Sequence, residues 1–112
     1  MKNKIRYSPE ALQDLDDIQA YITMELSSPD AAMNVTLRIM DAVARLQDFP
    51  EIGASLASIS GVESDYRFLV CDNYLAFYRT DSEKVYIDRV LYGRRDYMRI
   101  LFDEIAGKTK GQ

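Results

Sequence analysis

The sequence predicts an α+β protein in which an α-helical hairpin packs on a small antiparallel β-sheet. Two amphipathic helical patterns occupy residues 9–49, and three short apolar runs joined by tight polar turns occupy residues 66–91. A helical hairpin and a small sheet each present one apolar face, and packing the two together buries both. We therefore expect one domain spanning residues 1–112, with an N-terminal strand before the hairpin and a short C-terminal helix after the sheet.

The first strand and the first helix follow directly from local residue patterns. Ile5 and Tyr7 alternate with charged residues, which is typical of a short strand with one buried face. Ser8, Pro9 and Glu10 then predict a helix start, because serine caps, proline fits the first turn and glutamate suits the positive end of the helix dipole. Apolar residues recur at helical spacing as far as Leu26, and the acidic residues are expected mainly on the opposite face: Asp14, Asp16 and Asp17.

The second helix begins with the same signal, Ser27-Ser28-Pro29-Asp30. Its apolar positions follow at spacings of three and four as far as Phe49, where Pro50 ends the pattern. The very short link between the helices predicts an antiparallel hairpin. Residues 50–65 contain two glycines and several serines and are expected to form a loop, partly ordered by its apolar residues Ile52, Leu56 and Ile59.

Three strands are predicted after this loop. Tyr66–Cys71 and Tyr74–Arg79 flank Asp72-Asn73, a two-residue link typical of hairpins, and Val85–Leu91 follows a second polar turn. Strict alternation in the third run would place Arg89 and Leu91 on the same face as Val85. The C-terminal helix is predicted over Tyr97–Ala106, with Asp96 as its cap and residues 107–112 as a frayed tail.

Composition excludes several kinds of chemistry. The chain has no histidine and a single cysteine, Cys71, so histidine-based acid–base catalysis, a histidine-ligated zinc site and a thiolate metal cluster are all ruled out. No metal or other cofactor is expected, and any catalysis would depend on arginine, lysine, tyrosine or carboxylates.

The charge of −4 is unevenly distributed along the chain. Residues 1–65 carry five Lys/Arg and eleven Asp/Glu, a balance of −6, whereas residues 66–112 carry nine and seven, a balance of +2. The C-terminal half is therefore the candidate surface for an anionic target. No apolar run approaches the roughly 20 residues needed to cross a bilayer, and no signal peptide is visible, so we expect a cytoplasmic protein without a membrane partner.

Five segments in this order resemble the RelE/ParE superfamily of toxins from type II toxin–antitoxin systems. The resemblance covers roughly residues 5–102. The segments are Tyr7–Ala11 with Leu15, Leu46–Gly53, Tyr66–Val70, Asn73–Arg79, and Val85–Ile87 with Arg89–Tyr97. The resemblance implies a small toxin, of a class linked to plasmid stabilization, that a cognate antitoxin encoded beside it neutralises.

Within the superfamily two activities compete. RelE-like members cut mRNA in the ribosome, and ParE-like members inhibit DNA gyrase without a hydrolytic site. Leu75 stands where the nucleases tend to place an arginine, and Tyr92 stands where many relatives have histidine. Together with the acidic overall charge, these departures favour ParE-like gyrase inhibition over the alternative of a ribosome-dependent mRNA endonuclease.

The candidate site residues lie mostly in the C-terminal half. If the protein is a nuclease, Arg95 is expected to clamp the phosphate and Tyr97 to act as the acid. The wider set of candidates for target or phosphate binding is Arg67, Arg79, Arg89, Arg94 and Arg95. Arg94 and Tyr97 also have an ordinary structural interpretation, as a surface charge and as a core-packing residue. Arg67 and Arg79 lie on adjacent strands and are either part of a shared polar cleft or solvated and paired with Asp72, Asp81 or Asp88.

A third interpretation is a non-toxic binding module of a regulatory complex. Antitoxin segments are commonly disordered alone and bind as a helix or as an added strand. The first helix and the sheet edge are the expected docking surfaces, and Asp14, Asp16 and Asp17 are the candidate contacts for a basic antitoxin.

Overall fold

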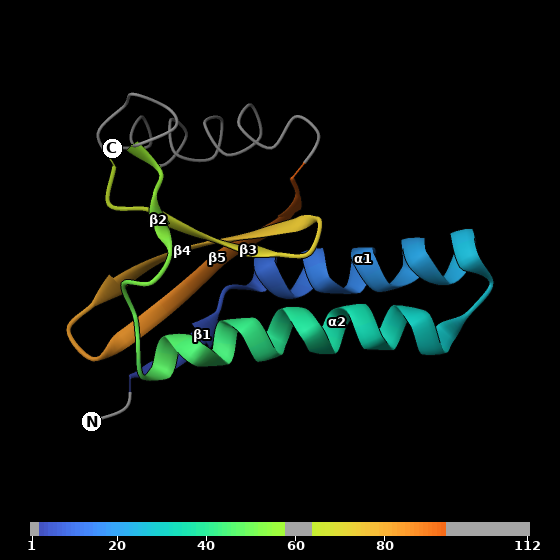
Figure 1. Ribbon diagram of the computed structural model, residues 1–112, viewed down its shortest axis with the longest axis horizontal. Coiled ribbons are helices and arrows are strands. Elements are labelled where there is room, and N and C mark those ends of the chain that lie inside the picture. The colour runs from blue at the N-terminus through green and yellow to red at the C-terminus, as the bar shows by residue number, and fades with distance from the viewer. Residues whose placement is uncertain (1–2, 58–63, 94–112) are drawn as a thin grey trace.

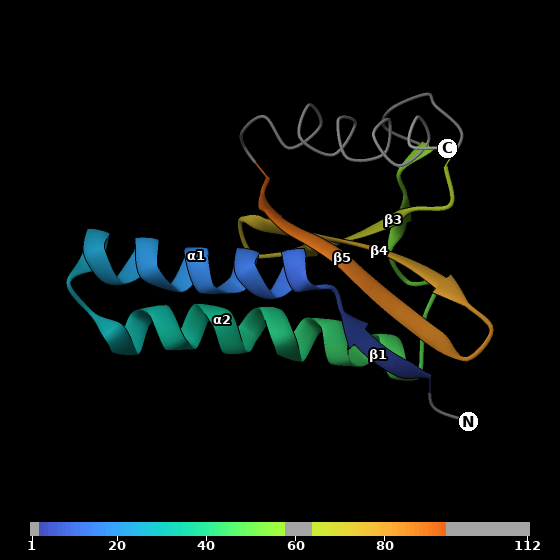
Figure 2. The same cartoon turned by 180° about the vertical axis from the view of Figure 1, so that it is seen from behind.

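The computed structural model describes residues 3–57 and 64–93 (Figure 1). The predicted C-terminal helix Tyr97–Ala106, the tail 107–112 and Ile59 lie outside the described residues. Within these ranges two helices lie side by side against one face of a five-stranded sheet (Figures 1 and 2). The predicted α+β class is confirmed. No helix in the described part of the chain has the length and hydropathy needed to span a membrane.

Both helices begin where the capping signals predict. Helix α1 spans Pro9–Leu26 and α2 spans Pro29–Ala44. The hydroxyl of Ser8 accepts a hydrogen bond from the backbone N–H of Ala11 at 2.9 Å, and the hydroxyl of Ser28 does the same for Ala31 at 3.2 Å. Each cap satisfies a backbone donor that the first turn leaves without a helical partner. Ser27 separates the helices in a left-handed conformation (φ 49°), which makes the hairpin tight.

The second helix is shorter than predicted. After Ala44 the chain tightens into the 3₁₀ helix η1, Arg45–Gln47, and Phe49 is exposed rather than on the buried face. Pro50 disfavours helical geometry at Phe49, the residue before it. The side chain of Phe49 is therefore exposed, whereas Leu46 remains fully buried.

The sheet has the order β1-β5-β4-β3-β2 and is mixed. Its strands are β1 Lys4–Tyr7, β2 Ala54–Ser55, β3 Arg67–Cys71, β4 Tyr74–Asp81 and β5 Lys84–Tyr92. The last three form the predicted antiparallel meander, and Asp72 adopts φ 57° in its first turn. The sheet is not wholly antiparallel, because β1 pairs parallel to β5. The short strand β2 lies inside the segment predicted as a loop.

A β-bulge in β5 changes which of its residues face the helices. Tyr78 pairs with Ile87, but Phe77 pairs with Arg89, so Asp88 is an extra residue in β5. Beyond the bulge the alternation shifts by one, and Val90 joins the helix-side core. The prediction that Leu91 shares a face with Val85 is therefore wrong: Leu91 packs with the cluster on the other face.

The core consists of two clusters separated by the sheet. The larger one lies between the sheet and the helices, and its fully buried side chains include Ile39, Val43, Leu46, Tyr78, Val85, Ile87 and Val90. The smaller cluster is built around Leu56, Leu75 and Phe77 on the opposite face. Leu75 and Phe77 alternate with Ala76 and Tyr78 along β4, which explains the division.

Candidate functional site

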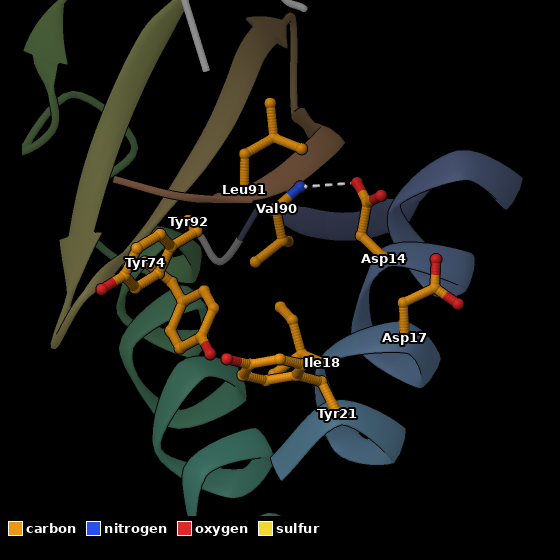
Figure 3. A pocket seen from close by; sticks show the side chains of 8 residues that line it. All are labelled: Asp14, Asp17, Ile18, Tyr21, Tyr74, Val90, Leu91 and Tyr92. Carbon is orange, nitrogen blue, oxygen red and sulfur yellow. Dashed lines mark hydrogen bonds between the residues drawn. The ribbon is translucent and has the colours of Figure 1, made fainter. Parts of the chain in front are cut away.

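An ion pair between α1 and the end of β5 is more buried than the two other ion pairs found among the described residues. The Asp14 carboxylate accepts hydrogen bonds from Arg89 Nε at 2.8 Å and from Arg89 Nη2 at 2.9 Å. It also accepts one from the backbone N–H of Val90 at 2.9 Å (Figure 3). The prediction that Asp14 lies on the polar outer face of the helix is wrong, because its carboxylate is buried against β5. Asp16 and Asp17 are exposed as expected.

Arg79 belongs to a second polar cluster around the bulge residue Asp88. Its Nε donates to Asp88 Oδ2 at 3.3 Å, and the Tyr66 hydroxyl donates to the same oxygen at 2.6 Å. The guanidinium also lies 4.6 Å from the centre of the Tyr86 ring. Burial alone would lower the pKa of Arg79, but the Asp88 carboxylate and the Tyr66 hydroxyl together outweigh burial and raise it above its ordinary value. Asp88 is thus the partner of Arg79 among the three that the sequence left open.

Arg67 lies on the other face of the sheet from Arg79. It pairs with Tyr78, the neighbour of Arg79 in β4, and successive residues of a strand point to opposite faces. Arg67 Nη1 donates to the carbonyl oxygens of Gly53 at 2.9 Å and Glu51 at 3.3 Å. The two arginines therefore do not share a cleft, and Arg67 instead holds the segment before β3.

At Gly53 the same segment approaches β3 and β4 very closely. Its backbone N–H donates to the buried Tyr78 hydroxyl at 2.9 Å, and a Cβ at this position would lie 2.5 Å from that oxygen and 2.7 Å from the Phe68 carbonyl oxygen. Only glycine fits so close an approach. Burial raises the pKa of Tyr78, and the Gly53 N–H and the Arg67 charge partly oppose that rise.

The remaining predicted residues, Arg94, Arg95 and Tyr97, lie outside the described residues. The structure describes the chain up to Gly93, the residue that precedes Arg94. Gly93, directly before Arg94, donates its N–H to the Asn73 carbonyl at 2.8 Å, beside the β3–β4 turn. The Asp14–Arg89 pair holds the strand three to four residues earlier.

Sequence reasoning missed a groove along α1. A pocket of about 620 Å³ lies between α1 and the end of β5, and an adjoining one of about 570 Å³ lies between the far end of the hairpin and the β3–β4 turn. Tyr21 and Tyr74 line both pockets. Figure 3 shows Tyr21, Tyr74 and Tyr92 around the first pocket, with Asp14 and Asp17 on its α1 side. We call these two pockets together the α1 groove.

The tyrosines of the α1 groove influence one another. The rings of Tyr74 and Tyr92 meet edge to face with centroids 5.6 Å apart. Burial raises the pKa of Tyr74, and the nearby Tyr92 and Tyr21 hydroxyls raise it further. The sequence offered one weak signal, its eight tyrosines, but nothing in it indicates that residues 21, 74 and 92 meet. Over residues 3–57 and 64–93 no group of three acidic or cysteine side chains could hold a metal ion.

Solved structures that share this fold include two from toxin–antitoxin systems. The chromosomal ParDE toxin–antitoxin system of P. aeruginosa contains a chain that is 22% identical, with a TM-score of 0.69 over 81% of this chain and 96% of that one. The RelBE2 toxin–antitoxin complex of Mycobacterium tuberculosis contains one that is 20% identical, with a TM-score of 0.57 over 82% and 99%. The architecture is thus the one found in ParE and RelE toxins.

Sequence comparison gives the family. A relative from Sinorhizobium fredii (strain NBRC 101917 / NGR234), described as "Putative toxin Y4kP", is 33% identical over 101 residues, which cover 89% of this chain and 98% of that protein. The family described as "ParE toxin of type II toxin-antitoxin system, parDE" matches residues 5–97. The chain belongs to this family, and the predicted resemblance to RelE/ParE toxins is confirmed. It is a toxin of a type II toxin–antitoxin system.

Proposed function

We propose that this toxin acts by binding and inhibiting DNA gyrase, and that it does not cleave RNA. The observation that supports this proposal is the state of the three described arginines that were candidates for phosphate binding. Arg67 donates to backbone carbonyls, Arg79 to Asp88 and Arg89 to Asp14. All three guanidinium groups take part in holding the protein's own fold.

RNA cleavage without a metal ion or histidine needs cationic side chains that reach the phosphate and a group that can donate a proton. Leu75, at the position where related nucleases tend to carry arginine, is buried in the smaller core cluster. The pKa of Tyr74 and that of Tyr78 are both raised by burial, which makes these hydroxyls weaker proton donors at neutral pH. A protein–protein inhibitor needs none of these groups.

A RelE-like ribosome-dependent mRNA endonuclease is the alternative function. Arg94 and Arg95 directly follow Gly93, whose N–H donates to the Asn73 carbonyl beside the β3–β4 turn, and Tyr97 comes two residues later. In this alternative Arg95 clamps the scissile phosphate and Tyr97 protonates the leaving oxygen. Under the gyrase proposal the role of the same arginines is to bind an acidic surface of the target protein.

The partner we propose is the antitoxin encoded beside the toxin gene, and the proposed site of action is the cytoplasm. The exposed carboxylates of Asp16 and Asp17 on α1 are the candidate antitoxin contacts. Asp14, whose carboxylate is bound to Arg89 and Val90, keeps α1 attached to β5.

Two assays with purified toxin separate the activities. We expect the toxin to block supercoiling of relaxed plasmid by gyrase, and we expect the purified antitoxin to restore it. Translating ribosomes treated with the same toxin should show no new mRNA cuts. Cuts that disappear with Arg95→Ala or Tyr97→Phe, together with an unaffected gyrase, would establish the nuclease instead. Normal growth of cells that express soluble toxin alone would leave only the non-toxic binding module.

A further inference from the structure

Two carboxylates of α1 without a cationic partner line the α1 groove. The helix carries acidic residues and no basic one: Glu10, Asp14, Asp16, Asp17 and Glu25. Asp14 is paired with Arg89, but Asp17 and Glu25 form no ion pair among the described residues. Both are exposed, and Asp17 lines the first pocket while Glu25 lines the second. Uncompensated negative charge in a concave surface raises the local concentration of cations.

Aromatic rings accompany these two carboxylates. Tyr21 and Tyr74 line both pockets, and Tyr92 stands beside them in the first (Figure 3). Tyr21 is 61% exposed, so its ring is accessible to a ligand. Burial and the neighbouring tyrosines raise the pKa of Tyr74, so this phenol is neutral at physiological pH. The face of a neutral tyrosine ring attracts ammonium groups, and the groove therefore combines two kinds of cation-binding group.

The spacing of the carboxylates indicates an elongated organic cation. Asp17 and Glu25 lie four residues before and after Tyr21, which separates them by about 12 Å along α1 at 1.5 Å per residue. Carboxylates that share one metal ion both lie within roughly 2.6 Å of it, so these two cannot do so. The first pocket also has an apolar lining: Ile18, Val90 and Leu91. A ligand with cationic ends and an aliphatic middle matches this arrangement.

We propose that the two pockets of the α1 groove together bind a linear aliphatic polyamine. Its end ammonium groups pair with Asp17 and Glu25, and its middle crosses the rings of Tyr21 and Tyr74, where an ammonium gains a cation–π contact. The pocket volumes, about 620 and 570 Å³, are within the range of small-molecule sites. The site is independent of the proposed target, so its absence would leave the gyrase proposal standing.

The test is titration calorimetry of purified toxin with spermidine at neutral pH and low salt. We expect one molecule to bind with a dissociation constant below about 1 mM. Asp17→Asn and Glu25→Gln together should weaken binding about tenfold, because both ion pairs are lost. Tyr21→Leu, which keeps an apolar side chain but removes the ring, should weaken it about threefold. Asp16→Asn is the matched control: this exposed residue of the same helix lines neither pocket, and its replacement should leave affinity unchanged within about twofold.

Circular dichroism and thermal unfolding of each variant establish that it is folded. Equal affinity of wild-type toxin and the folded double variant would overturn the site, as would the absence of binding to wild type. Mg²⁺ at an equal concentration of positive charge should displace little spermidine. Full displacement would show only a diffuse attraction of cations to acidic α1 and overturn the proposal. Nuclear Overhauser contacts should join the spermidine methylene protons to the Tyr21 and Tyr74 rings, and contacts only to residues outside the two pockets would contradict it.

Discussion

Two ion pairs fasten the helical hairpin to the sheet, and they differ sharply in burial. Asp14 of α1 holds Arg89 of β5 with side chains 10% and 18% exposed, whereas Arg38 of α2 holds Asp72 of the β3–β4 turn with side chains 60% and 50% exposed. The closest N···O distance is 2.8 Å in both. Distance alone therefore does not distinguish them; the number of hydrogen bonds and the exclusion of water do.

We expect the fold to require the buried pair, whereas the exposed pair adds only a little to the free energy of unfolding. Two charges taken out of water are tolerated only when their hydrogen bonds are satisfied, and Asp14 meets this condition with three bonds, one of them to the Val90 backbone. The exposed pair forms in high dielectric and competes with water and salt. We therefore expect α1 to depend on its ion pair far more than α2 does.

The largest effect is expected from Asp14→Ala. Because it removes the carboxylate that balances a mostly buried guanidinium, the free energy of unfolding should fall by about 3–5 kcal/mol. Urea denaturation followed by circular dichroism measures this change. Asp16→Ala, an exposed acidic neighbour, should stay within about 0.5 kcal/mol of wild type. A similar small loss for both variants would contradict the requirement.

A double variant separates the charge from the backbone bond. In Asp14→Leu with Arg89→Met the uncompensated charge is gone, so we expect a smaller loss than in Asp14→Ala. The Val90 N–H still lacks its acceptor, and a deficit of about 1–3 kcal/mol should remain. A double variant as unstable as Asp14→Ala would place the whole effect in the Val90 bond. Full recovery would place it in the charges.

The exposed pair should contribute little. A double-mutant cycle with Arg38→Ala and Asp72→Asn is expected to give a coupling energy of about 0.2–1 kcal/mol at low salt. Asparagine is the suitable replacement because residue 72 has a φ of 57°, which asparagine tolerates better than alanine. The coupling should shrink further in 1 M salt. A coupling above 2 kcal/mol would remove the contrast between the two pairs.

The smallest effect at neutral pH concerns Tyr7, on the strand that leads into α1. Burial, with a smaller contribution from Cys71, raises the pKa of Tyr7 from 10.0 to about 12. The folded state therefore favours the neutral phenol. The resulting contribution of Tyr7 to the free energy of unfolding is fully present below pH 10 and is lost as the pH rises from 10 to 12. Measured by denaturant unfolding at several pH values across this range, the free energy of unfolding should fall more steeply with pH for wild type than for Tyr7→Phe. Identical slopes would mean that Tyr7 ionises as readily in the folded protein as in the unfolded one.

The sequence by itself determined the elements that depend on local chemistry. The capping serines Ser8 and Ser28, the two amphipathic stripes and the Asp72-Asn73 turn act through residues a few positions apart, so they could be located without coordinates. The family resemblance rested on such segments in order and needed no contact between distant residues.

Only the tertiary structure decided how these elements meet. The bulge at Asp88 depends on β4 register, and it reversed the faces predicted for Val90 and Leu91. Asp14 looked like a solvated charge because its partner lies 75 residues away. The α1 groove likewise requires Tyr21 and Tyr74 to be neighbours. Packing of the helix on the sheet brings them together, and the periodicity of neither segment predicts it. Local propensity acts over one or two turns, whereas burial and pairing are properties of the closed fold.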